Sequence, residues 1–231
     1  MDKNYRQLTL VFILTMVMIL PAFSMGNAPA TTATGGTKMA ETTTAGQVLN
    51  VTEDTWVYAF RPDRNYGNGG GWKDRTNPGE PVTLPKMFLG FGGEDKKIVL
   101  LKFDLSSLAK GKTINKAEVL VYNDFAGSDA AIKVAAKRII SSWDEMKATY
   151  RNQPKTGPVL STTSLRGSIG YKQPGKWYRF DVTEAARAWQ AGSTNYGIML
   201  DPEGESGVDF DLVAREYQQK AEYTPRLEIS Y

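Results

Sequence analysis

The stretch Lys96-Lys97-Ile98-Val99-Leu100-Leu101-Lys102-Phe103-Asp104-Leu105-Ser106-Ser107-Leu108 decides the fold. Residues 98–101 are apolar without interruption, which is typical of a strand that is covered on both faces. From Leu101 onward, apolar and polar residues alternate with a period of two, the pattern of a half-buried strand. We therefore predict a central β-strand in this stretch, with Phe103 in the core.

Further short segments with the strand pattern surround this stretch. We predict strands at residues 48–60, 87–91, 114–122, 132–140, 176–180, 196–201, 208–214 and 226–231. Residues 155–175 are rich in Gly, Ser, Thr and Pro and are predicted to form an irregular connection. Many short strands at close spacing favour an all-β, antiparallel β-sandwich.

Two segments carry helix signals. Residues 182–191 have Asp181 as a candidate N-cap, Gly192 as a candidate C-terminal residue and Trp189 on the apolar face, which predicts one short helix with Trp189 in the core. The spacing of Ser142 and Glu145 matches a capping box, which predicts one helical turn at residues 143–147.

The first part of the chain is typical of an export signal. Lys3 and Arg6 precede the apolar residues 8–20, and small residues follow at Ala22 and Ser24. This pattern predicts a signal peptide over residues 1–24. The apolar segment is shorter than the roughly 20 residues of a membrane-spanning helix, and an uncleaved membrane anchor is the alternative.

The segment after the signal is rich in Thr, Ala and Gly, and we predict a flexible linker over residues 25–47, followed by one domain over residues 48–231. The protein is then secreted and extracellular, without membrane contact after cleavage, or bound to the cell surface if the segment stays in place.

Composition excludes several function classes. The 231 residues contain no Cys and no His, which excludes a Ser-His-Asp triad, thiolate and imidazole metal sites and a cysteine nucleophile. The chain has 28 basic and 25 acidic residues, a net charge of +3, and this near balance does not favour a nucleic-acid partner.

The long loop at residues 61–85 is the candidate ligand-binding region. Loops longer than about 12–15 residues are uncommon unless they are functional or disordered, and this one combines two aromatic with four basic residues. Aromatic faces stack on sugar rings, and cations bind hydroxyls and carboxylates. The candidates are Arg61, Arg64, Tyr66, Trp72, Lys73 and Arg75. The alternative is a solvated insertion whose aromatic residues pack on the sheet.

Oxygen-rich loops of exported β-sandwiches suit calcium, which prefers carboxylate ligands. Asp54, Asp209 and Asp211 are the candidate ligands for a structural calcium ion. Asp209 and Asp211 lie on one face of a predicted strand, and the alternative is a solvated strand edge.

Several motifs, taken in order, resemble one family. They are Asp54-Thr55-Trp56-Val57, Asn65-Tyr66-Gly67, residues 100–106, residues 117–122, Trp143-x-Glu145, residues 149–154, Phe180-Asp181-Val182-Thr183, Asn195-Tyr196-Gly197-Ile198, Arg215-Glu216 and Pro225-Arg226-Leu227. Over residues 48–231 the chain resembles the DNRLRE domain, also called carbohydrate-binding module family 96, and the related disaggregatase-type repeats. Lys102 stands where Arg is common in that family.

The resemblance implies a jelly-roll β-sandwich that binds polysaccharide, in some members acidic, uronate-containing polymers. The leading hypothesis is therefore a secreted, non-catalytic polysaccharide-binding module. One alternative is a structural protein of the cell surface or extracellular matrix. Another is a polysaccharide-degrading enzyme that uses paired carboxylates or Tyr and Lys, although no spacing in the sequence singles out a catalytic pair.

The signal peptide predicts a processed N-terminus. Protein recovered outside the cell should begin between Met25 and Thr31, because the signal peptidase removes the apolar segment. Intact-mass measurement checks this, and a mass that retains residues 8–20 would establish the membrane-anchor alternative instead.

Overall fold

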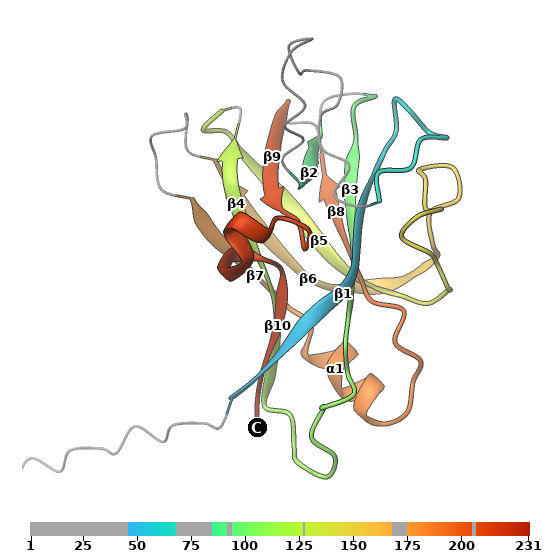
Figure 1. Ribbon diagram of the computed structural model, residues 1–231, viewed down its shortest axis with the longest axis vertical. Helices are drawn as coiled ribbons and strands as arrows, with labels where there is room; N and C mark the ends of the chain where they lie inside the picture. The colour runs from blue at the N-terminus through green and yellow to red at the C-terminus, as the bar shows by residue number, and fades with distance from the viewer. Residues whose placement is uncertain (1–45, 68–84, 92–93, 127, 168–174, 205–206) are drawn as a thin grey trace, which may run out of the picture. The chain divides into compact units, whose positions relative to one another are not determined.

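A computed structural model describes residues 46–67, 85–91, 94–126, 128–167, 175–204 and 207–231 (Figure 1). The predicted signal peptide and nearly all of the predicted linker lie outside the described residues. Within the described part of the chain, no helix combines the length and the apolar composition that a membrane crossing requires.

The described residues form mostly β-strands that pair antiparallel. The strands are β1 (Gly46–Tyr58), β2 (Lys86–Phe91), β3 (Lys97–Phe103), β4 (Lys116–Ala126), β5 (Ala131–Ile139), β6 (Thr156–Arg166), β7 (Lys176–Asp181), β8 (Ile198–Glu203), β9 (Val208–Val213) and β10 (Arg226–Ser230). Helix α1 (Thr183–Gln190) and the 3-10 helix η2 (Gln218–Tyr223) complete the elements. The prediction of an all-β, antiparallel fold is confirmed, whereas the jelly-roll topology stays a prediction.

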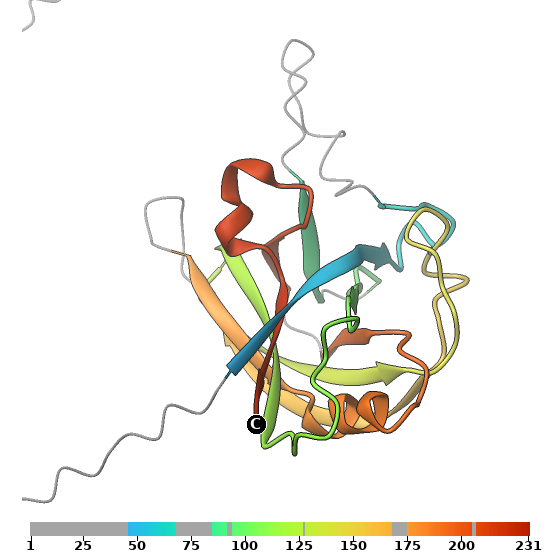
Figure 2. The ribbon, with the colours of Figure 1, turned by 60° about the horizontal axis from the view of Figure 1, so that its bottom comes forward.

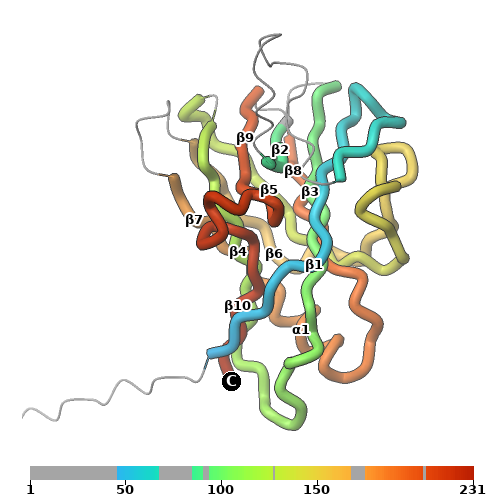
Figure 3. Tube along the Cα trace, viewed as in Figure 1, coloured from blue at the N-terminus to red at the C-terminus, as the bar shows by residue number. Residues whose placement is uncertain are grey.

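Strand β1 pairs with two strands that lie apart in the strand order. The order is β1-β10-β4-β9-β2-β3-β8-β5-β6, with β7 on β4 and an additional pairing of β1 with β3. The first half of β1 pairs with β10, from Gly46 opposite Ser230 to Asn50 opposite Arg226, and its second half pairs with β3. Figures 2 and 3 show β1 crossing from β10 to β3. The strands β1, β10, β4, β9, β2 and β3 therefore close into a ring.

Strand β3 is covered on both faces, as the sequence predicts. Val99, Leu101 and Phe103 pack into the large apolar core, in which Phe103 is 2% exposed. Ile98 and Leu100 point the other way, into a smaller cluster. That second cluster contains Val57, Ile139, Ala148 and Met199, with Trp143, Tyr150 and Tyr196 at its border. The uninterrupted apolar run therefore reflects two cores on opposite sides of one strand.

Helix α1 forms close to its predicted position. It spans Thr183–Gln190, and Trp189 is buried in the large core as predicted. Val182 and not the predicted Asp181 occupies the N-cap position, without a side-chain cap, and Asp181 Oδ1 accepts hydrogen bonds from the backbone N and the Oγ1 of Thr183 at 2.9 and 2.6 Å. Gly192 follows the helix in a left-handed conformation, with φ at +101°.

Three sequence predictions need correction. Strand β1 begins at Gly46, so the last two residues of the predicted linker are strand. Thr156–Arg166 forms strand β6 although an irregular connection was predicted; its residues are exposed or half-buried except for Leu165, and the strand is held by its pairing with β5. The turn near residue 145 is capped by Asp144, whose Oδ1 accepts from Met146 N at 2.8 Å, and Glu145 instead bonds to Arg215.

Burial of Phe103 predicts a large loss of stability on truncation. Phe103→Ala should lower the free energy of unfolding by about 3–5 kcal/mol, because a buried ring is replaced by a cavity. Ile140, which is 48% exposed, provides the matched control: Ile140→Ala should change it by about 0.5 kcal/mol or less. Urea unfolding of both variants checks the prediction. If Phe103→Ala lowered the free energy of unfolding as little as Ile140→Ala does, Phe103 would lie outside the core.

Candidate functional site

The structure describes only some of the predicted ligand-binding residues of the long loop. Trp72, Lys73 and Arg75 lie outside the described residues. Tyr66 is 6% exposed and stacks on Trp56, with ring centroids 3.8 Å apart. For Tyr66 the alternative interpretation holds: its ring packs in the core and is not available to a sugar.

The two arginines of the loop lie nearer the surface. Arg61 is exposed, and the guanidinium of the half-buried Arg64 lies 5.1 Å from the centroid of the Tyr66 ring. The structure therefore leaves Arg61 accessible to solvent and ties Arg64 to the buried Tyr66.

Two Asn-Tyr-Gly turns have the same structural role. Asn65 Nδ2 donates to the carbonyl oxygens of Glu145 and Ala148, both at 2.8 Å, and Asn195 Nδ2 donates to the carbonyl of Phe103 at 2.9 Å. In the second turn, a Cβ on Gly197 would lie 2.1 Å from the Leu101 carbonyl oxygen, so only glycine fits. Both turns dock loops onto neighbouring segments, and the first turn thereby positions Glu145.

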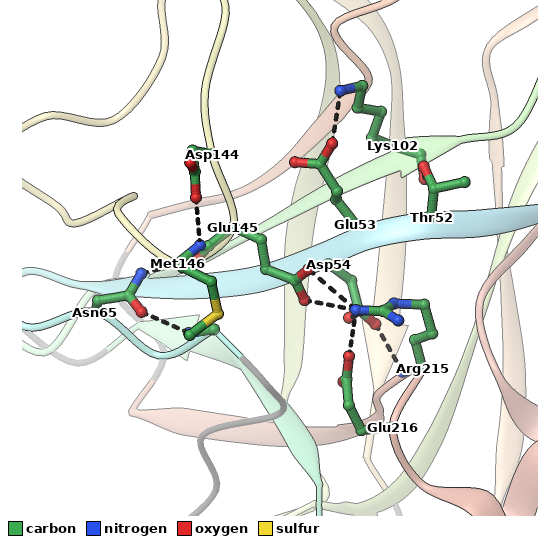
Figure 4. A network of polar contacts seen from close by, with 11 residues as sticks. Thr52, Glu53, Asp54, Asn65, Lys102, Asp144, Glu145, Met146, Arg215 and Glu216 are labelled. Carbon is green, nitrogen blue, oxygen red and sulfur yellow. Dashed lines mark hydrogen bonds and ion pairs between the residues drawn. The ribbon is translucent and has the colours of Figure 1, made fainter.

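Glu145 belongs to a carboxylate cluster around Arg215 (Figure 4). Arg215 Nη2 lies 3.0 Å from both carboxylate oxygens of Glu145 and 2.5 Å from Glu216 Oε1. The backbone N of Arg215 donates to Asp54 Oδ2 at 2.8 Å. Strand β1, the segment after β9 and the loop between β5 and β6 are joined at this point.

The cluster holds more negative than positive charge. Asp54 is fully buried, and burial, together with the neighbouring Glu216 and Glu145, raises the pKa of Asp54 to about 8 although Arg215 opposes the shift. Burial also raises the pKa of Glu145. Asp54 is therefore protonated at neutral pH, which relieves repulsion among the three carboxyl groups.

The three predicted calcium ligands are not brought together. Asp209 pairs with Lys97 at 2.9 Å, and Asp211 pairs with Lys86 at 3.3 Å, whereas Asp54 lies in the cluster around Arg215. Carboxylate oxygens of Asp54, Glu145 and Glu216 approach within 4.8 Å of one another, but the Arg215 guanidinium already lies against two of these three groups. Calcium binding stays a prediction.

An aromatic group that sequence analysis did not select lies on the sheet face of β7, β4 and β10. Tyr122 of β4 is opposite Trp177 of β7, with ring centroids 5.3 Å apart, and Tyr223 of η2 lies 4.1 Å from Tyr122. The guanidinium of Arg226 on β10 lies 4.2 Å from the Trp177 ring centroid. All four side chains are partly exposed. We call these four residues the aromatic platform.

A chain of ion pairs continues from the aromatic platform along the same face. Arg226 Nε is 2.9 Å from Glu228, Arg179 Nη1 is 2.9 Å from Glu228 and 3.1 Å from Glu118, and Lys116 Nζ is 2.7 Å from Glu118. Basic and acidic side chains therefore alternate. Although burial opposes the shift, the hydrogen bonds from Arg226 and Arg179 lower the pKa of Glu228. We call these five residues the ion ladder.

A surface pocket of about 310 Å³ lies at the far end of the ion ladder. Its lining residues are Gly46, Gln47, Val48, Lys116, Glu118, Glu228, Ile229 and Ser230. They come from β1, β10 and β4, and Lys116, Glu118 and Glu228 belong to both the ladder and the pocket. Platform, ladder and pocket thus form one continuous polar and aromatic surface.

A sequence signal for this surface existed but was incomplete. The period of two places Glu118, Leu120 and Tyr122 on one face of their strand, and Trp177 and Arg179 on one face of theirs. Only the order β7-β4-β10 brings these faces together. Strand order depends on contacts far apart in the sequence, so alternation alone could not identify the surface.

The raised pKa of Asp54 predicts a pH dependence. The folded protein keeps the Asp54 proton up to about pH 8, whereas the unfolded chain releases it near the ordinary aspartate pKa of 3.8. Stability should therefore fall as the pH rises between these values, by up to about 1.4 kcal/mol per pH unit. Asp54→Asn should flatten this decline in urea unfolding measured from pH 4 to pH 8.

Asp104→Asn is the matched control, because Asp104 is exposed and its pKa is lowered by hydrogen bonds from Ser106. The stability of this variant should fall between pH 4 and pH 8 as steeply as that of the unmodified protein. If the stability of Asp54→Asn fell as steeply as well, the proton would not reside on Asp54.

Comparison with known proteins places these features in a family. Over 162 residues, or 68% of the chain, it is 25% identical to the tRNA nuclease WapA of Bacillus subtilis (strain 168) and 24% identical to the tRNA3(Ser)-specific nuclease WapA of Bacillus spizizenii. The match spans only 6% of the length of each of those proteins. The model of carbohydrate-binding module family 96 matches residues 45–231, so the chain belongs to this family of carbohydrate-binding modules.

Proposed function

We propose that this protein is a secreted, non-catalytic polysaccharide-binding protein whose ligand lies on the β7-β4-β10 face. The observation that carries the proposal is the aromatic platform, where Tyr122, Trp177 and Tyr223 gather beside Arg226 on an exposed sheet face of a chain from a carbohydrate-binding family. Flat apolar rings beside charged hydrogen-bonding groups suit a sugar, which has apolar ring faces and polar edges.

Secretion and the absence of catalysis are supported by other features. The basic and apolar start of the sequence supports export. The close carboxyl groups Asp54, Glu145 and Glu216 surround Arg215 and join three segments of the fold. That arrangement supports a structural role for them rather than the open carboxylate pair of a glycosidase.

Uronate-containing polymers remain the proposed ligands of the long loop. Exposed Arg61, together with the sequence positions Trp72, Lys73 and Arg75, would supply cations and a ring to an acidic chain. The WapA proteins are named as nucleases, but the match covers a small part of them. Their activity does not enter this proposal.

Substitutions distinguish the two surfaces. Trp177→Ala and Tyr122→Ala should each weaken polysaccharide binding by about tenfold, equivalent to about 1.4 kcal/mol, through lost contact with the sugar ring. Trp72→Ala and Arg75→Ala should leave that binding unchanged if the sheet face holds the ligand. Affinity electrophoresis against a polysaccharide panel, followed by calorimetry on the best ligand, measures both.

Phe60→Ala is the control for loss of an exposed ring, since Phe60 is 61% exposed and lies outside the platform. Its affinity should equal that of the unmodified protein. Binding that survives both platform substitutions but is lost with Trp72→Ala would assign the ligand to the long loop. A protein that binds no polysaccharide in the panel would contradict the proposed function itself.

A further inference from the structure

The ion ladder indicates what kind of polysaccharide the sheet face accepts. It contains the cations Lys116, Arg179 and Arg226 and the carboxylates Glu118 and Glu228, and each cation contacts at least one carboxylate. Asp181 lies opposite Glu118 in the strand register and adds a third acidic group. Positive and negative charges on this face are therefore balanced.

The neighbouring charges beyond the platform are balanced as well. Lys86 contacts both Asp124 and Asp211, and Lys220 contacts Asp124. Two basic and two acidic side chains thus continue the pattern beside Tyr122. The described part of this face does not form a positive surface that would attract a polyanion over a distance.

Arg179 is the most accessible cation near the centre of the ladder. Its side chain is 50% exposed, while Nη1 is already held by Glu118 and Glu228. A ligand carboxylate on Arg179 would come close to these two carboxylates and would be repelled by them. A hydroxyl group avoids that conflict, because it accepts a hydrogen bond from a guanidinium and donates one to a carboxylate at the same time.

The dimensions of the surface suit a chain rather than a single sugar. Tyr122 and Glu118 lie four residues apart on β4, a span of about 13 Å at the rise of a β-strand. The pocket of about 310 Å³ then continues beyond Glu118. A sugar ring on the aromatic platform and a second sugar unit at the ion ladder and pocket would therefore be successive units of one polysaccharide chain.

We infer that the β7-β4-β10 face selects a neutral, hydroxyl-rich polysaccharide, with one sugar unit on the aromatic platform and a following unit hydrogen-bonded to Arg179, Glu118 and Glu228. This inference rests on the proposed function. It excludes acidic polymers as preferred ligands of this face.

Salt dependence tests the charge of the ligand. The purified protein is titrated with hydroxyethyl cellulose, galactomannan and polygalacturonate at about 50 mM and about 500 mM NaCl, because salt screens contacts between exposed charges. We expect at least one neutral polymer to bind more tightly than polygalacturonate, with an affinity that changes less than about twofold between the two salt concentrations. Trp177→Ala should weaken this binding by about tenfold.

Removal of the two carboxylates should change the selectivity. Glu118→Gln with Glu228→Gln keeps the size of both side chains but leaves the cations without their partners, so the variant should gain salt-sensitive binding to polygalacturonate and lose affinity for the neutral polymer. Glu203→Gln with Glu184→Gln is the charge-matched control, since both residues are exposed and lie outside the ladder, on β8 and α1. This control should bind like the unmodified protein, and far-ultraviolet circular dichroism verifies that all variants are folded.

Two results would overturn the inference in different ways. If the unmodified protein prefers polygalacturonate, with salt-sensitive binding that Arg179→Gln and Trp177→Ala both abolish, the face is an acidic-polymer site; the inference then fails while the proposed function stands. If neither class of polymer binds at either salt concentration, the proposed function fails and the inference fails with it.

Discussion

The pairing of β1 with two different partners is the constraint on which the rest of the structure depends. Its first half lies on β10, the last strand of the chain, and its second half lies on β3. A register shift between Val51 and Glu53 accompanies the change of partner. Because this one strand closes the ring, the last strand, the large core and the β7-β4-β10 face are all positioned by it.

Several residues of the family motifs serve this architecture. Asn65 and Asn195 fasten their turns to distant carbonyl groups, and Arg215 holds Glu145 and Glu216 beside Asp54. Such contacts need particular side chains at particular positions, because a buried polar group without its partner is costly. These motif residues therefore stabilise the fold, whereas Glu118, Tyr122 and Arg226, which also lie in family motifs, belong to the proposed ligand surface.

Two kinds of charged cluster illustrate that distinction. The group around Arg215 is largely buried and has more carboxyl groups than cations, so it holds a proton and ties three segments together. The ion ladder is more open, and its alternating charges keep both hydrogen-bond donors and acceptors near the surface. Exposure and charge balance, rather than the number of carboxylates, separate the structural cluster from the candidate ligand surface.

The sequence by itself determined the local structure. Alternation and uninterrupted apolar runs predict most of the strands, the position of α1 and the burial of Phe103 and Trp189, because these depend on neighbours along the chain. Strand β6 was missed because its exposed and half-buried residues show no continuous apolar face and the strand is held by its pairing with β5. Tyr66 was predicted on a loop surface, yet it stacks on Trp56 in the core.

Only the tertiary structure decided which residues act together. Tyr122, Trp177, Tyr223 and Arg226 come from four elements, and no spacing along the chain relates them. Likewise, Asp54 meets Glu145 and Glu216 and does not meet Asp209 or Asp211, although all three aspartates look alike in the sequence. The physical reason is that strand order and loop docking are set by long-range pairing and core packing, and local patterns carry no information about them.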